Sequence, residues 1–260
     1  MTPEWNPSQP SILGLDIGGT KTALVEGTDS AEILQRAELL TEANRPFAET
    51  FPRLLAAAKQ VLENAAATGR QVKAVSVSIG GPLQIQEGIL LDPPHLPGWH
   101  GAHLKAALQD EFPHLPVFIE HDGNAGALAE FHFGAGKGRA GLRHLIFLTF
   151  GTGLGAGLII NGQVLHGATD TAGEVGHLRL AWEGPVGFGK VGSWEGFASG
   201  QALVEQQGSH QQEAGESDRA ARVARPLALA EFEHEHAGRQ GAARIATEQV
   251  AVLGDDGQGQ

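Results

Sequence analysis

Two glycine-rich segments and one aspartate carry the residues that could do chemistry in this 260-residue chain. The first segment reads Asp16-Ile17-Gly18-Gly19-Thr20-Lys21 and follows an apolar stretch. Glycines let backbone N–H groups turn toward a phosphate, while Thr20 adds a hydroxyl, Lys21 adds a charge, and Asp16 can hold Mg²⁺ through water. The hexapeptide predicts phosphate binding, whereas its Gly-Gly pair alone would favour an ordinary hairpin.

The second glycine segment runs from Phe150 to Gly157 (FGTGLGAG) and offers Gly151, Thr152, Gly153 and Gly155 as phosphate contacts. A dinucleotide-binding loop would open a helix here, but the apolar residues 158–161 continue as a strand that ends in an Asn-Gly turn. The pattern therefore indicates a second strand-turn-strand loop, and the two loops could hold the two ends of a triphosphate. A purely structural turn is the alternative. A nicotinamide-dependent oxidoreductase is disfavoured because strands follow both loops.

Asp122 stands at the end of the short apolar segment 117–120, before Gly123 and Asn124. A hydroxyl that attacks a terminal phosphate must lose its proton, and a carboxylate at this place can accept it. The alternative is that Asp122 only caps a helix that begins near Ala125.

Three further side chains suit the hydroxyls of a sugar. Glu174 and His177 are three residues apart, so a helical turn would direct both toward one ligand, and Glu195 is the third candidate. The alternative for this stretch is a surface loop with a satisfied histidine.

These residues need strands and helices that position them. Apolar patterns predict strands at 11–16, 22–26, 72–79, 117–120, 145–150 and 158–161, and helices at 48–67 and 125–133. Such alternation indicates an α/β protein with mixed sheets. We expect an N-terminal lobe over 1–121 with the first phosphate motif, and a C-terminal lobe over 122–200 with Asp122, the second motif and the sugar contacts. We expect residues 201–260 to be an atypical, incomplete C-terminal segment, with candidate helices at 227–236 and 242–250 and a candidate strand at 249–254.

Composition limits the classes of partner. The net charge of -12 argues against a nucleic-acid backbone as the main partner, and the lack of cysteine excludes disulfides, thiolate catalysis and cysteine-based metal sites. The sequence has neither an apolar run that could cross a membrane nor a signal peptide, so a cytoplasmic location without membrane contact is expected.

The order of motifs DIGGTK, GGP, LPGW, HDGN, FGTGLGAG, GEVGH and WEGFASG resembles the ROK family of sugar kinases and related repressors over residues 11–200. The resemblance implies an actin-like (ribonuclease H-like) two-lobed ATPase fold, phosphorylation of a hexose such as glucose with ATP and Mg²⁺, and a possible homodimer. It makes Asp122 the catalytic base. It also assigns phosphate contacts to Gly18, Gly19, Thr20, Lys21, Gly151, Thr152, Gly153 and Gly155, and substrate contacts to His121, Asn124, Glu174, His177 and Glu195. Only fifteen residues precede Asp16, which disfavours the repressor branch.

Three departures from the family pattern matter. The stretch 186–193 lacks the cysteines of a zinc motif found in many relatives, so we expect no zinc, with apolar packing of Val186 and Phe188 in its place. His121 stands where the family usually has a sugar-binding Asn. The Gly-rich adenosine loop that follows the last strand in relatives is missing after residue 254. A catalytically impaired sugar- or nucleotide-binding relative is therefore the alternative function.

Overall fold

A computed structural model describes residues 10–151, 153–200, 202 and 250–254 of the chain. The described chain divides into two compact units. The first consists of Met1–Leu148, Ala156–Gly173 and Ala251–Gln260, and the second of Thr149–Gly155 and Glu174–Val250. The lobe boundaries expected from the sequence stay a prediction.

A five-stranded mixed sheet in the first unit has the strand order β3-β2-β1-β4-β7. The antiparallel strands β1 (Ser11–Ile17), β2 (Lys21–Thr28) and β3 (Ile33–Leu40) follow one another, and β4 (Val72–Ile79) and β7 (Val117–His121) join parallel to β1. The predicted strands are confirmed here, but β3 was missed. Its sequence, ILQRAELL, places charged and polar residues between the apolar ones without strict alternation, because β3 is an exposed edge strand.

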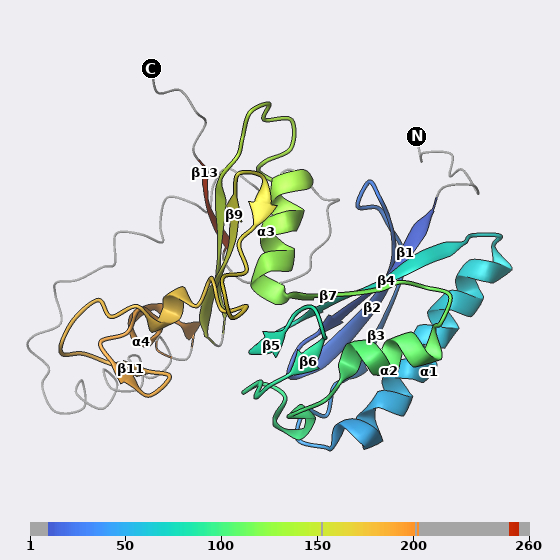
Figure 1. The fold of residues 1–260 in the computed structure, drawn as a ribbon, viewed down its shortest axis with the longest axis horizontal. Helices are drawn as coiled ribbons and strands as arrows, with labels where there is room; N and C mark the ends of the chain where they lie inside the picture. Colours follow the sequence, from blue (N-terminus) through green and yellow to red (C-terminus); the bar gives the residue numbers. More distant parts are fainter. Residues whose placement is uncertain (1–9, 152, 201, 203–249, 255–260) are drawn as a thin grey trace, which may run out of the picture. The chain divides into compact units, whose positions relative to one another are not determined.

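Two helices pack on this sheet, α1 (Phe47–Ala67) against β1, β2 and β3, and α2 (Leu104–Glu111) against β7 (Figure 1). The predicted helix over 48–67 is confirmed, whereas α2 was not predicted. Alternate strand residues and one face of each helix form the core, which includes Leu13, Leu15, Ile17, Leu54, Val61, Val75, Val77, Ile79, Leu104 and Leu108. Since side chains alternate along a strand, burial of the apolar set leaves the other face of β1, β4 and β7 to present polar groups.

The second sheet has the order β10-β9-β8-β13, with β8 (Leu145–Phe150), β9 (Leu154–Ile160), β10 (Gln163–Val164) and β13 (Val250–Gly254). Helix α3 (Asp122–His132) packs on it through Ala127, which shares a small core with Leu145, Phe147 and Ile159. The strand predicted at 249–254 is confirmed as β13. The helix predicted at 227–236, and all but the last residue of that predicted at 242–250, lie outside the described residues.

Two predicted boundaries were wrong in this region. β9 begins at Leu154 rather than at 158, because Leu154 and Ala156 are buried and pair the glycine-rich stretch into the sheet. α3 begins at Asp122 rather than near Ala125, because His121 caps the helix. The second glycine loop is therefore shorter than expected, and Asp122 is a helical residue.

The remaining elements are short. The first unit contains the two-residue strands β5 (Leu83–Gln84) and β6 (Ile89–Leu90) and the 3₁₀ turn η1 (Pro97–Trp99). The second contains the 3₁₀ turn η2 (Val175–His177), the strands β11 (Val186–Gly187) and β12 (Lys190–Val191), and helix α4 (Trp194–Ala198). Among the described residues, no helix is both long and apolar enough to span a membrane.

Candidate active site

Three adjacent parallel strands of the first sheet end at the same edge. The last residues of β1, β4 and β7 lie in one row, because Ile17 pairs with Ile79 and Ile79 pairs with His121. The next residues along the chain are the first glycine loop, the Gly80-Gly81 pair and Asp122. In α/β sheets, ligands bind outside the carboxyl ends of parallel strands. Pairing of the strands therefore brings the predicted phosphate loop and the predicted base to one edge.

The first glycine loop, Gly18-Gly19-Thr20, closes the hairpin between β1 and β2 with a bond from Gly18 N–H to the Lys21 carbonyl (3.0 Å). Its carbonyls are held by Thr41, a buried residue that directly follows β3. The Lys21 ammonium is exposed and pairs with Glu38 at 3.0 Å. A surface ion pair of this kind contributes little free energy, so Lys21 can exchange it for a phosphate contact.

Asp16 lies one residue before the end of β1, beside Ser78 of β4. Burial raises the pKa of its carboxyl, a hydrogen bond from Ser78 lowers it, and the negative charge of Asp122 raises it further, so the net shift is upward. Asp16 and Asp122 are thus close enough to repel each other. Two carboxylates held in this way would both be stabilised by a cation at the edge.

Asp122 begins α3, and its side chain is half exposed. Its Oδ1 accepts a hydrogen bond from Gly123 N–H at 2.7 Å and lies 3.2 Å from Nδ1 of His121. That nitrogen also accepts from Gly123 N–H at 3.3 Å, so the imidazole caps the helix. The predicted base is therefore oriented by the start of its own helix and remains open to a ligand.

Glu120, which the sequence reading missed, links the residues on both sides of Asp122. Its Oε1 accepts from the backbone N–H of His121 and from Nδ2 of Asn124, both at 2.9 Å. Its Oε2 lies 2.8 Å from Nε2 of His166. Asn124, predicted as a substrate contact, is buried, and its amide is directed to Glu120. The only signal in the sequence was a carboxylate at the end of an apolar strand.

His95 was also missed, and it borders the same edge. A Cβ atom built on Gly19 would lie 2.8 Å from the His95 carbonyl oxygen, so the glycine loop packs directly on this residue. A Cβ atom on Gly80 would lie 3.8 Å from Cδ2 of His95 and 3.6 Å from Oδ2 of Asp122. The imidazole and the carboxylate are therefore neighbours of one glycine. His95 directly precedes the LPGW motif, and a lone histidine beside such a motif gives no signal of its own in the sequence.

The second unit holds the other predicted contacts. The second glycine loop is closed by bonds from Gly151 N–H to the Gly153 carbonyl (2.9 Å) and from Gly200 N–H to the Gly151 carbonyl (2.7 Å). Oε2 of Glu195, from α4, accepts from Leu154 N–H at 2.9 Å. A Cβ on Gly153 would lie only 2.7 Å from that oxygen, so any larger residue there would displace the Glu195 carboxylate. Gly155 lies within β9, and Thr152 is outside the described residues.

Glu174 and His177 lie on one helical turn, as their spacing predicts. Glu174 precedes η2, and its carbonyl accepts from His177 N–H at 3.2 Å. The His177 ring stacks on Phe188, with ring centroids 4.8 Å apart and planes inclined by 27°. Nζ of Lys190 donates to the His177 carbonyl at 2.6 Å. The second unit therefore joins Glu174, His177, Glu195 and the second glycine loop in one cluster of short elements.

Comparison with known proteins identifies the family to which this chain belongs. The model of the ROK family matches residues 12–253. The chain belongs to the ROK family. The fold class is thereby confirmed as α/β with the actin-like ATPase fold of ROK sugar kinases.

ROK relatives of this chain include both enzymes and regulators. A glucokinase of Streptomyces coelicolor is 35% identical over 193 residues, which cover 74% of this chain and 57% of the glucokinase. A xylose repressor of Caldicellulosiruptor bescii is 32% identical over 205 residues, which cover 76% and 49%. The structure of a ROK glucokinase from Streptomyces griseus in complex with glucose and AMPPNP has a TM-score of 0.60 and 32% identity, covering 79% of this chain and 64% of that one. The chain thus spans about half the length of its curated relatives.

The zinc motif found in many ROK proteins is replaced here by a hairpin. β11 and β12 pair through a two-residue turn, Phe188-Gly189. Both residues have positive φ values, 49° at Phe188 and 72° at Gly189, as a type I′ turn requires. Phe188 stacks on His177 but is 63% exposed, and Val186 is 55% exposed, so the predicted apolar packing of these two residues is wrong. A structural zinc site needs four nitrogen or sulfur ligands. Without cysteine, and with no cluster of three His, Asp or Glu among the described residues, this segment does not fit zinc.

Proposed function

We propose that this chain transfers the terminal phosphoryl group of ATP to a hydroxyl of a hexose, glucose or a related sugar, with Asp122 as general base. The observation that carries the proposal is the shared edge of β1, β4 and β7, where the first glycine loop, Asp16 and Asp122 meet. Membership of the ROK family and the similarity to glucokinases support it.

The reaction needs little covalent participation by the protein. The sugar oxygen forms a bond to the terminal phosphorus, the bond to the bridging oxygen breaks, and ADP leaves. Asp122 accepts the hydroxyl proton as the new bond forms. The backbone N–H groups of Gly19 and Thr20 and the Lys21 ammonium bind the phosphate oxygens, while the Gly18 N–H closes the hairpin on the Lys21 carbonyl. The rate arises mainly from positioning and charge stabilisation.

The residues at the edge fit a magnesium ion. Asp16 is half-buried, its pKa is raised, and it faces the charge of Asp122, so a cation there would relieve an unfavourable arrangement. Mg²⁺ in kinases is usually held by one or two carboxylates together with waters and substrate phosphates. Asp16 is the residue that would hold it, and the ion would neutralise charge on the phosphates.

We assign the sugar hydroxyls to Glu174, His177 and Glu195 of the second unit, and to His121 beside the base. The Glu174–His177 turn and the anchoring of Glu195 on Leu154 support the first three assignments. His121 is larger than the asparagine usual at this position, and its Nδ1 is directed to the helix start. We therefore expect the sugar preference to differ from that of asparagine-bearing relatives.

A catalytically impaired sugar- or nucleotide-binding protein is the second candidate. It is favoured by the similarity to xylose repressors. Such a protein would bind a sugar or nucleotide without releasing ADP.

A coupled ADP-release assay over hexoses and N-acetylhexosamines separates the two candidates. A kinase gives sugar-dependent turnover that falls by about 10²- to 10⁴-fold in Asp122→Asn, the usual contribution of a general base. Folded protein that binds a sugar but shows no turnover with any of them would favour the second candidate. Turnover unchanged in Asp122→Asn would remove this residue from its proposed role.

A further inference from the structure

We propose that Thr41 is a positioning residue that sets the first phosphate loop in its ligand-binding conformation. The inference rests on the proposed nucleotide binding by that loop. Thr41 directly follows β3 and lies 23 residues along the chain from Gly18, yet it is only 3% exposed and bonds to the loop twice. None of the motifs in the sequence contains it.

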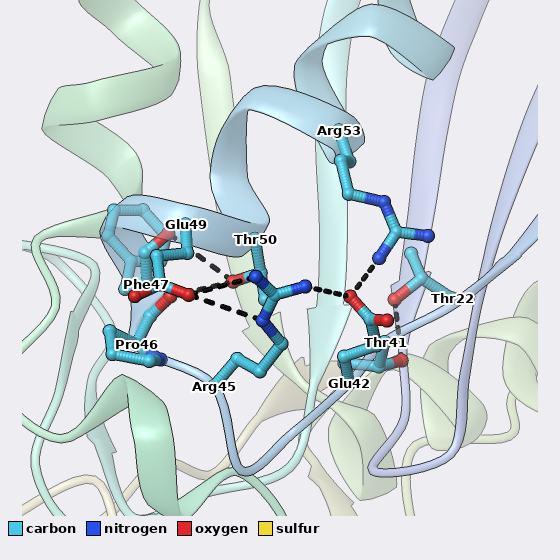
Figure 2. A network of polar contacts seen from close by, with 9 residues as sticks. All are labelled: Thr22, Thr41, Glu42, Arg45, Pro46, Phe47, Glu49, Thr50 and Arg53. Atoms are coloured by element: carbon cyan, nitrogen blue, oxygen red, sulfur yellow. Dashed lines mark hydrogen bonds and ion pairs between the residues drawn. The ribbon is translucent and has the colours of Figure 1, made fainter.

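Thr41 holds the loop by its backbone and by its side chain. Its N–H donates to the Thr20 carbonyl at 3.0 Å, and its hydroxyl donates to the Gly18 carbonyl at 2.7 Å. The Thr22 hydroxyl lies 2.9 Å from the Thr41 hydroxyl, and Figure 2 shows the two side chains facing each other. Because the single proton of Thr41 Oγ1 goes to Gly18, Thr22 is the donor of this pair. The two buried threonines therefore form a chain of hydrogen bonds that runs from the Thr22 hydroxyl to the Thr41 hydroxyl and ends at the Gly18 carbonyl.

The bond to Gly18 fixes the direction of the next amide. In a trans peptide the C=O and the following N–H point to opposite sides. With the Gly18 carbonyl bound to Thr41, the Gly19 N–H must point away from Thr41. That N–H has no hydrogen-bond acceptor among the described residues of the chain. A phosphate oxygen is the kind of acceptor that suits it.

The glycines cannot set this conformation alone. Glycine populates a wide range of backbone angles, so a Gly-Gly loop without an external tether would sample many orientations of its N–H groups. Thr41 supplies the tether from a fixed place, because it is buried and directly follows β3, which pairs with β2 up to Leu40. In the exposed turn after it, Glu42 accepts from Arg45 (3.3 Å) and from Arg53, and Arg45 also pairs with Glu49 (Figure 2).

Nucleotide affinity of matched threonine variants tests this role. Thr41→Val removes the hydroxyl, and Thr41→Ser keeps it. Thr50→Val is the control, because Thr50 is equally buried (4% exposed) but donates to the Pro46 and Phe47 carbonyls of α1 (Figure 2). We expect Thr41→Val to raise the Kd for Mg·ADP and the KM for ATP by about tenfold, as the loss of one buried hydrogen bond would. The KM for sugar should stay unchanged, and Thr41→Ser and Thr50→Val should bind ADP like the wild type.

The amide resonance of Gly19 provides a readout that does not require activity. Thr41→Val should move this resonance in the nitrogen–proton correlation spectrum of the free protein, and Thr50→Val should leave it in place. If Thr41→Val does not fold, Thr22→Val, which removes only the donor to Thr41, should move the resonance in the same direction by less. If the wild type binds no ADP, the proposed function fails, and the Gly19 resonance alone decides on Thr41. An unmoved resonance, or an ADP affinity of Thr41→Val equal to that of Thr50→Val, would overturn the inference.

Discussion

Replacement of Glu120 by Ala removes three hydrogen bonds that surround Asp122. The acceptors lost are those for His121 N–H, for Nδ2 of Asn124 and for Nε2 of His166. Each such bond contributes a net of about 1 kcal/mol, and the buried Asn124 amide would be left without its acceptor, which costs about as much again. The partly exposed His166 ring regains water, which offsets part of the loss. We expect a decrease in the free energy of unfolding of about 2–4 kcal/mol.

That decrease corresponds to a fall in Tm of about 5–12 °C for a protein of this size, measured by calorimetry. The kcat should also fall by about tenfold to a hundredfold, because Asp122 loses the contacts that fix its neighbours. Glu120→Gln should be milder, since an amide can accept from Asn124 and donate to His166. Glu111→Ala is the matched control, because within the described part of the chain Glu111 pairs only with exposed Lys59 on the surface. A Glu120→Ala protein with the Tm and kcat of the Glu111→Ala control would refute the reasoning.

Three further outcomes follow from the charges and the donor set. Asp16→Asn should abolish most ATP turnover yet raise Tm at neutral pH. Burial raises the pKa of the Asp16 carboxyl, so this carboxyl contributes stability at low pH, and that contribution is lost as the pH rises and the carboxyl ionises. A gain in Tm that is larger at pH 4 than at pH 7 would contradict this. Burial opposes ionisation of Glu26, but hydrogen bonds from Arg70, Gln35 and Ser11 outweigh it and lower its pKa, so wild-type stability should fall as pH drops below about 4. Glu26→Gln should flatten that dependence and cost about 3 kcal/mol at pH 7, because the partly buried Arg70 guanidinium loses the carboxylate charge of Glu26; an unchanged acid profile would count against it. Elemental analysis of purified protein should find no stoichiometric zinc, and one zinc per chain would overturn that expectation.

Much of the fold could be predicted because its signals are local. The strands that became β1, β2, β4, β7 and β8 are apolar runs bounded by glycine or polar residues. The edge strand β3 and helix α2 were not predicted, because each buries only a narrow apolar face and has a weak apolar pattern. The start of β9 was not predicted because glycine is rare in strands. Here the burial of Leu154 and Ala156 outweighs the low strand preference of glycine.

The residues of the candidate site likewise include some that the sequence could predict and some that it could not. Asp16, Asp122 and the glycine loops could be found because residue type and spacing together indicate phosphate chemistry. Thr41, Glu120 and His95 could not, since their roles depend on which strand ends lie side by side. A threonine after an unpredicted strand has no pattern of its own, and only the pairing of β2 with β3 brings it to the first loop.

The tether on the first glycine loop also has a consequence for the order of assembly. The loop, Thr22 and Thr41 all belong to three consecutive antiparallel strands, whose pairings join residues close in sequence. Such short-range contacts cost little chain entropy and form early. β4 and β7 enter the sheet only after the crossovers that contain α1 and α2. We therefore expect that a growing chain can form the phosphate loop, with its tether in place, before Asp122, the proposed base for the sugar hydroxyl, has been synthesised.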